Sequence, residues 1–119
     1  MLLTLLKSKI HRATVTECEL EYEGSCSIDG ELMDAVGIVQ FERIEVYNIN
    51  MGTRFSTYAI REEEGSGKVI INGAAARLAQ PGDLVIICAF TQMDEENIRA
   101  HHPSVAHLDG ENRVSNFSS

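Results

Sequence analysis

The stretch Tyr22-Glu23-Gly24-Ser25-Cys26-Ser27 carries the residues of this chain best suited to chemistry. Gly24 has no β-carbon, so its carbonyl is sterically open, and the hydroxyl of Ser25 follows it directly. A serine hydroxyl can attack such a carbonyl if the fold strains the peptide bond and stabilises the developing oxyanion. The same residues also favour an ordinary turn, because Gly24 permits unusual backbone angles and Ser25 and Ser27 can bond their own backbone. The rest of the chain must supply the groups that distinguish the reaction from the turn.

Neither the histidines nor the cysteines predict a metal site. His101, His102 and His107 are close in sequence, but no carboxylate pair or cysteine lies at ligand spacing beside them. The three cysteines are odd in number and lack the short spacing of metal ligands: Cys18, Cys26 and Cys88. Reduced thiols in a cytoplasmic protein are therefore expected.

The charge balance excludes some classes of partner. Asp and Glu number 18 against 10 Lys and Arg, which gives a net charge of −8. That field repels nucleic acid and anionic membranes, so a small anionic ligand requires a local cluster of cations. The apolar start Met1–Leu6 is interrupted by Lys7 and is far shorter than a membrane span or a signal-peptide core, so we expect a buried strand there.

Two elements are expected to flank the Gly24-Ser25 corner. Thr14–Glu23 alternates strictly, with glutamates on one face and Cys18, Leu20 and Tyr22 on the other, which predicts a half-buried strand. After the corner, Asp29 is placed to cap a short helix over 31–36, and Gly37 is placed to end it.

The middle of the chain predicts a hairpin and a buried pair of strands. The hairpin joins Arg43–Ile49 to Arg54–Ile60 through a turn at 50–52. Beyond an acidic exposed loop at 62–67, the expected elements are a strand over 68–72, a helical turn over 73–78, a turn over 80–83 and a central strand over 84–90.

Less regular secondary structure is expected in the C-terminal part of the chain. A short helical piece is expected over 93–98, a last strand over 104–108, and a loose polar tail over 111–119. The chain shows no internal repeat or linker, so one domain spanning residues 1–119 is expected. Many short strands with closely spaced turns predict a mainly β fold, a small barrel with short helices.

Four separated segments together resemble one family. They are Lys9 with His11, Tyr22-Glu23-Gly24-Ser25, Arg54-Phe55-Ser56-Thr57-Tyr58 and Asn72-Gly73-Ala74-Ala75-Ala76. Their order and spacing resemble the bacterial pyruvoyl-dependent aspartate 1-decarboxylases, with matches from near the start to about Phe90. The resemblance implies a six-stranded double-psi β-barrel and a homotetramer with active sites between subunits.

The resemblance also implies a maturation reaction. The proenzyme would cleave itself between Gly24 and Ser25, giving a β chain of residues 1–24 and an α chain of residues 25–119. Ser25 would become a covalently bound pyruvoyl cofactor, the Schiff-base site for L-aspartate, and no metal is implied. Some relatives mature with a partner protein, and the sequence leaves open whether this chain needs one.

By similarity, the other matching residues take roles in cleavage, substrate binding and proton transfer. Thr57 would assist self-cleavage and bind substrate, and Tyr58 would donate the proton that replaces carbon dioxide. Arg54 would bind a substrate carboxylate. The remaining substrate-binding assignments are Lys9, His11, Tyr47, Asn72, Gly73, Ala74 and Ala75.

Tyr47 is a departure, because many family members have tryptophan there, and the smaller ring puts substrate affinity in question. The activity implied is decarboxylation of L-aspartate to β-alanine for pantothenate synthesis. The residues also leave open a non-enzymatic small barrel that binds or assembles with other molecules, and a decarboxylase for another small amino acid.

Overall fold

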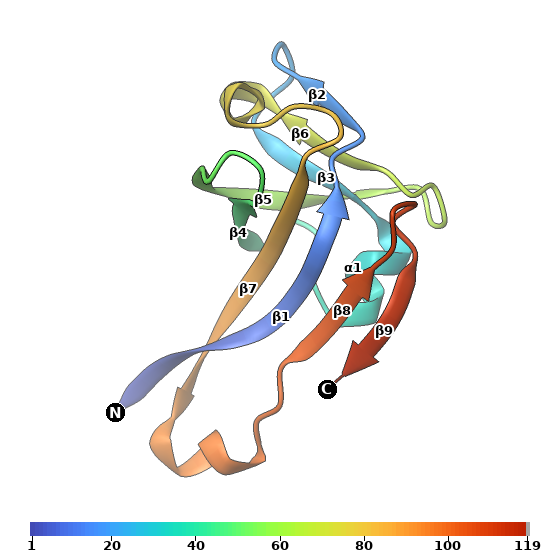
Figure 1. The fold of residues 1–119 in the computed structure, drawn as a ribbon. Helices are drawn as coiled ribbons and strands as arrows, with labels where there is room; N and C mark the ends of the chain where they lie inside the picture. The colour runs from blue at the N-terminus through green and yellow to red at the C-terminus, as the bar shows by residue number, and fades with distance from the viewer. Residues whose placement is uncertain (119) are drawn as a thin grey trace.

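The computed structural model describes residues 1–118, which form one nine-stranded sheet and three short helices. The strands occur along the sheet in the order β2-β6-β3-β5-β4-β7-β1-β8-β9 (Figure 1). Their bounds are β1 Leu2–Thr14, β2 Glu17–Glu19, β3 Ser25–Asp29, β4 Arg43–Asn48, β5 Arg54–Glu62, β6 Val69–Asn72, β7 Leu84–Asp94, β8 Ser104–Leu108 and β9 Val114–Ser118. The helices are α1 Gly30–Val36 and the 3₁₀ helices η1 Gly73–Leu78 and η2 Glu95–Ala100.

Strands β1 and β7 form the longest pairing and run side by side along the molecule (Figure 1). Their inward residues, such as Ile10 and Ile87, are fully buried, whereas the alternate positions face outward. Register shifts between Leu6 and Ser8 and between His11 and Ala13 interrupt the ladder. Each shift is a β-bulge that changes which side chains face outward.

The prediction of one strand over residues 14–23 is mostly wrong. Only Glu17–Glu19 forms a strand, β2, which pairs in parallel with β6. From Leu20 the chain turns, with the Tyr22 N–H donating to the Glu19 carbonyl at 3.3 Å. Leu20 and Tyr22 are exposed. The alternation was misleading because an exposed loop can alternate as regularly as a strand when no neighbour buries its apolar side.

Helix α1 agrees with its prediction. The Asp29 carboxylate accepts from the Glu31 N–H at 2.9 Å, and Gly37 ends the helix with a φ of 77°. Strand β1 satisfies the helix carbonyls, because the Ser8 hydroxyl donates to Val36 O at 2.5 Å and the Lys7 ammonium donates to Gly37 O at 2.8 Å. The first bulge of β1 therefore joins the sheet to α1.

The hairpin and the buried pair of strands are confirmed. β4 and β5 pair antiparallel from Arg43↔Tyr58 to Tyr47↔Arg54, around a turn that contains Gly52. β6 and β7 match the predicted strands, although β7 continues to Asp94. The alanine-rich segment between them is a 3₁₀ helix rather than an α-helical turn.

The C-terminal segment is more ordered than expected. β8 is not the last strand, because Val114–Ser118 forms β9 and pairs antiparallel with it. Within the predicted tail, Asn112 is 2% exposed. Its side chain accepts from Thr14 N at 2.7 Å and donates to Thr14 O at 2.9 Å and Gly67 O at 2.8 Å. Ser119 lies outside the described residues.

The architecture is mainly β, as predicted. It has nine strands where six were expected, and its two edge strands, β2 and β9, do not pair with each other. One continuous core joins inward residues of most strands to α1. Within residues 1–118 no helix is both long and apolar enough to cross a bilayer.

Replacement of Asn112 tests the anchoring of the C-terminal turn. Asn112→Ala removes three hydrogen bonds and places alanine at a φ of 58°, a backbone conformation that asparagine tolerates better. We expect a loss of about 2 kcal/mol, or roughly 10 °C in the thermal midpoint measured by circular dichroism. Asn116→Ala, at an exposed position of β9, is the matched control and should leave the midpoint within about 2 °C. Equal midpoints for the two variants would contradict this role.

Candidate active site

The corner before β3 holds a glycine with open space at its β-carbon position, followed by an oriented hydroxyl. Gly24 lies in a bend, and a β-carbon built on it would meet no atom within 4 Å. Ser25 begins β3 and is 7% exposed. Its hydroxyl donates to Glu23 O at 3.4 Å and accepts from Asn72 Nδ2 at 3.1 Å. The Ser25 hydroxyl is thus held between Glu23 and Asn72, directly after Gly24.

Asn72 is the polar partner of this corner. It ends β6 directly opposite Ser25 in the β3–β6 ladder and is 5% exposed. Its Nδ2 group also donates to the Ser27 hydroxyl at 3.1 Å, whereas its Oδ1 atom is buried without a partner. An unpaired buried acceptor is costly, so Oδ1 offers a binding position for a donor placed beside Ser25.

Gly73 allows two backbone segments to meet. Its φ is 75°, and a β-carbon there would lie 2.6 Å from Gly24 Cα, 2.7 Å from Gly24 N and 3.1 Å from Tyr22 O. Every one of these atoms belongs to backbone, so a larger residue would displace the corner. Ala74 and Ala75 follow in η1, with Ala75 packed against the core.

Thr57 and Tyr58 approach the corner from β5. The parallel β3–β5 ladder begins at Cys26↔Ala59, so continuing its register back by two residues places Tyr58 beside Ser25 and Thr57 beside Gly24. Within the described chain, no hydrogen bond joins the Thr57 hydroxyl to Gly24. The Tyr58 ring lies 6.4 Å from that of Phe41, measured between centroids and tilted by 49°.

A second group, on the outer face of the sheet, contains the four remaining predicted residues: Lys9, His11, Tyr47 and Arg54. Across β1, β7, β4 and β5, the register places His11 opposite Ile86, Ile86 opposite Tyr47, and Tyr47 opposite Arg54. The Arg54 guanidinium carbon lies 4.3 Å from the centroid of the Tyr47 ring, a cation–π contact. Lys9 is two residues before His11 and faces the same side.

Burial and neighbouring charges shift the pKa values of two residues in this second group. Burial, followed by the Coulombic effects of Lys9, His107 and Arg12, lowers the pKa of His11 below its ordinary value of 6.5. The His107 ring is 5.0 Å from that of His11. Burial, followed by Cys88 and Glu45, raises the pKa of Tyr47, and Arg54 opposes this effect. At neutral pH the group therefore presents a neutral imidazole and a neutral phenol beside two cations.

The structure separates the two groups within one chain. Arg54 and Tyr58 lie on the same face of β5 but four residues apart, a span of about 13 Å. Among the contacts of residues 1–118, no hydrogen bond or ion pair connects the corner with the second group. One chain thus presents the Gly24-Ser25 corner and, elsewhere, a surface that carries cations beside an aromatic ring.

Sequence reasoning missed Ser27, Phe41 and His107 as neighbours of the predicted residues. Ser27 had a usable signal, because it is two residues after Ser25 and faces the same side of β3. Phe41 and His107 had no such signal in the sequence, because their contacts join segments that are distant along the chain. Cys26 is fully buried, and burial raises the pKa of its thiol to about 12. Within residues 1–118 there is no cluster of three or more His, Cys, Asp or Glu side chains that could hold a metal.

Comparison with known proteins gives concordant matches. Residues 1–115 match the sequence model of the aspartate decarboxylase family. The aspartate 1-decarboxylase of Thioalkalivibrio sulfidiphilus is 59% identical over 114 residues, covering 96% of this chain and 90% of the relative. Those of Methylococcus capsulatus and Albidiferax ferrireducens are 52% and 56% identical, covering 97% and 96% of this chain and 91% and 84% of the relatives.

Replacement of Gly73 tests the close approach at the corner. Gly73→Ala introduces a β-carbon 2.6 Å from Gly24 Cα and should move the Gly24-Ser25 peptide away from Asn72. We expect any cleavage of that peptide to slow by at least about tenfold, equivalent to 1.4 kcal/mol, as followed by intact-mass analysis. Gly110→Ala, where a β-carbon would meet no atom within 4 Å, is the matched control. Unchanged cleavage in Gly73→Ala would show that the close approach is not required.

The pKa of His11 tests the charge of the second group. Lys9→Met removes a cation near His11 while keeping a long side chain, so the pKa of His11 should rise toward 6.5. A histidine with a lowered pKa stabilises the fold above the unfolded value of about 6.5, and that contribution is lost as the pH falls below it. An NMR titration of His11 measures the change, with the exposed Lys68→Met as control. A pKa of His11 that is equal in the wild type and Lys9→Met would contradict the proximity.

Proposed function

This chain belongs to the aspartate decarboxylase family, and from that premise we propose that it is a self-processing lyase that converts L-aspartate to β-alanine and carbon dioxide. The observation that carries the proposal is the pairing of Ser25 with Asn72 directly after Gly24, a residue with open space where a β-carbon would lie. The β-alanine supplies pantothenate synthesis, and hence coenzyme A. The relatives named aspartate 1-decarboxylase support the choice of substrate.

The first reaction is cleavage of the chain by its own residues. Ser25 Oγ attacks the Gly24 carbonyl carbon, and the Ser25 nitrogen leaves, so that an ester replaces the amide. β-Elimination releases residues 1–24 with a carboxylate and leaves dehydroalanine at position 25. One water hydrolyses the dehydroalanine to a pyruvoyl group and ammonia. In this step Thr57 donates a hydrogen bond to the Gly24 oxygen, a role supported by its register position on β5.

The residues around position 25 suit a pyruvoyl group. The unpartnered Asn72 Oδ1 can accept a hydrogen bond from a nitrogen of bound substrate, and Gly73 brings its backbone against the corner, with the small Ala74 and Ala75 next in the chain. When bound, a pyruvoyl group supplies a carbonyl that condenses with the substrate amine and withdraws electrons as carbon dioxide leaves. Tyr58 supplies the proton to the carbon that loses the carboxylate.

The second group binds the dicarboxylate substrate. Arg54 carries a planar guanidinium that can bind a carboxylate through two hydrogen bonds, and stacking on Tyr47 orients it. Lys9 and His11 add local positive potential and a polar ring in a chain whose net charge is −8. Because the two groups are separated within one chain, the site is completed between neighbouring subunits of a homotetramer. Exposed Tyr22, beside the corner, is available for that contact.

The finer fold assignment is a double-psi β-barrel in one domain. β1 and β2 are separated only by Val15-Thr16, and Thr16 N donates to Val69 O at 2.8 Å. Treated as one interrupted strand, β1 with β2 pairs with β7 on one side and β6 on the other. Six strands would then follow one another around a ring in the order β6-β3-β5-β4-β7-β1/β2. This pairing supports the barrel, with β8 and β9 as additions.

The cellular setting is part of the proposal. Three free cysteines, Cys18, Cys26 and Cys88, suit the reducing cytoplasm. Whether maturation requires a partner protein is a separate question. It is answered by testing whether the purified chain cleaves without added protein.

The decisive test is the state of the Gly24-Ser25 bond. Intact-mass analysis of the wild type should give residues 1–24 and a pyruvoyl-blocked fragment of residues 25–119, and aspartate should release carbon dioxide. Ser25→Ala should give one uncut, folded and inactive chain, whereas Ser66→Ala, in the half-buried loop between β5 and β6, should cleave normally. Cleavage only after addition of cell extract would indicate a maturation partner.

Two outcomes would overturn the proposal. A wild-type chain that stays uncut with cell extract, and that forms no borohydride-stable adduct with aspartate on the fragment starting at position 25, would favour a non-enzymatic binding module. Carbon dioxide release from another small amino acid but not from aspartate would change the substrate.

A further inference from the structure

Phe41 occupies a conformation that disfavours its residue type. Its φ is 70°, in the left-handed region that glycine and asparagine adopt most readily. Its side chain is 68% exposed, so burial of the ring contributes little that would offset the strain. A bulky, exposed residue held in this conformation requires an explanation from what its ring contacts.

The backbone of Phe41 is attached to the residue that follows Tyr58. Phe41 N donates to Ala59 O at 2.7 Å, and Ala59 N donates to Glu42 O at 2.9 Å. These two bonds extend the β4–β5 pairing past Arg43↔Tyr58. The loop that carries Phe41 is therefore in fixed register with Tyr58.

A partly buried ion pair holds the loop from its other side. Lys7 Nζ lies 2.7 Å from Glu42 Oε2 and 2.8 Å from Glu42 Oε1, and Glu42 Oε1 also accepts from Val39 N at 3.1 Å. Lys7 is the residue between the two registers of the first β1 bulge. The bulge, the ion pair and the Ala59 bonds thus restrain the backbone around Phe41 at three points.

The Phe41 ring is directed at Tyr58. The two centroids are 6.4 Å apart with an interplanar angle of 49°, within the range of favourable aromatic pairs. Tyr58 is 36% exposed, so part of its ring is free of other contacts. An aromatic neighbour of this kind biases one rotamer over another by a factor of roughly 2 to 10.

We propose that Phe41 is a positioning residue for Tyr58, whose phenol it restricts to the orientation that delivers a proton to the substrate carbon after carbon dioxide leaves. The inference rests on the proposed function, in which Tyr58 is the proton donor. Phe41 does not touch the reacting atoms and acts only through the Tyr58 ring.

The test replaces the ring while keeping the backbone. Phe41→Asn suits a φ of 70° and removes the aromatic contact, so the thermal midpoint should not fall and cleavage at Gly24-Ser25 should be unchanged. We expect kcat to fall about 3- to 10-fold with KM changed less than about twofold. Phe41→Tyr should restore kcat, and Val39→Asn, at a 63% exposed position of the same loop, is the matched control.

A double-mutant cycle separates positioning from a general effect. In a Tyr58→Phe background, Phe41→Asn should lower kcat no further, because the proton donor is already absent. A second readout, independent of activity, is the fluorine NMR resonance of 3-fluorotyrosine at position 58, which should shift in Phe41→Asn and not in Val39→Asn.

Each outcome discriminates between the inference and its premise. Wild-type kcat in Phe41→Asn, or an equal fall of kcat in the Tyr58→Phe background, would overturn the role of Phe41 while leaving the decarboxylase intact. Wild-type kcat in Tyr58→Phe would overturn both the proton donor and its positioning. A wild type that releases no carbon dioxide from aspartate would overturn the proposed function and this inference together.

Discussion

The contact between the backbones of Gly73 and Gly24 is the constraint on which the corner depends. A β-carbon at position 73 would come within 2.6 Å of Gly24, so only glycine lets β6 turn into η1 against the loop before β3. The same turn ends β6 at Asn72, opposite Ser25. One steric condition therefore sets both the path of the chain at Gly24-Ser25 and the position of the amide that binds the serine hydroxyl.

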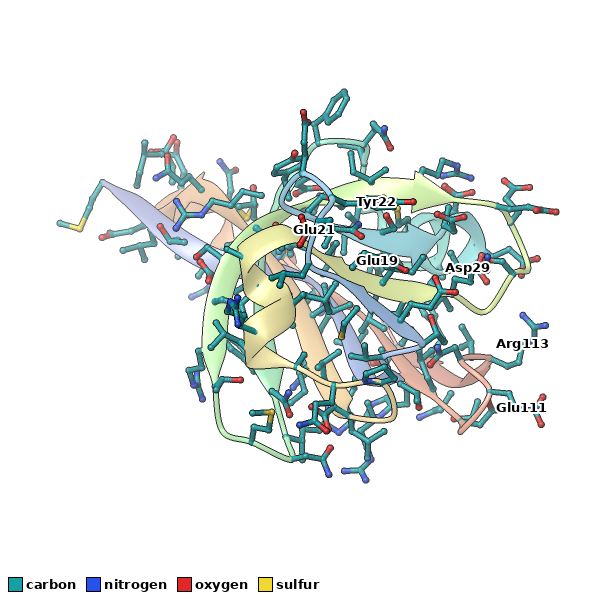
Figure 2. The ribbon with its side chains drawn as sticks, turned by 90° about the horizontal axis from the view of Figure 1, so that it is seen from above. Glu19, Glu21, Tyr22, Asp29, Glu111 and Arg113 are labelled. Carbon is teal, nitrogen blue, oxygen red and sulfur yellow. The ribbon has the colours of Figure 1, made fainter. Side chains whose placement is uncertain are left out.

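The other end of β3 is held by a buried carboxylate. Asp29 is 1% exposed and accepts hydrogen bonds from the backbone of Glu31, Gly65 and Gly67, each at 2.9 Å. Arg113 Nη1 lies 3.9 Å from the same carboxylate, and Figure 2 shows Arg113 on the side of the molecule where Asp29 lies. Since buried charge is costly without partners, this arrangement fixes β3 at Asp29 while Asn72 fixes it at Ser25. A strand held at both ends can keep one peptide at its start in a defined conformation.

Charge is distributed unevenly over the surface of the chain. The net charge of −8 opposes an anionic ligand, yet the outer face of β1 and β5 carries Lys9 and Arg54 beside the aromatic ring of Tyr47. Burial, followed by the charges of Lys9, His107 and Arg12, lowers the pKa of His11 and favours its neutral form near pH 7. Local potential, rather than net charge, therefore governs which ligand this face can bind.

The sequence alone determined the residues able to react and the elements with strong local signals. Asp29 and Gly37 marked the ends of α1, the turn at Gly52 marked the hairpin, and the spaced segments around Ser25 and Arg54 indicated the family. These features depend on neighbours in the chain, which sequence displays directly. Tertiary structure decided that Leu20 and Tyr22 are exposed, that Asn112 is buried, and that Phe41 faces Tyr58. It also decided that the predicted site divides into two groups, because strand order and register depend on long-range pairing that no local pattern encodes.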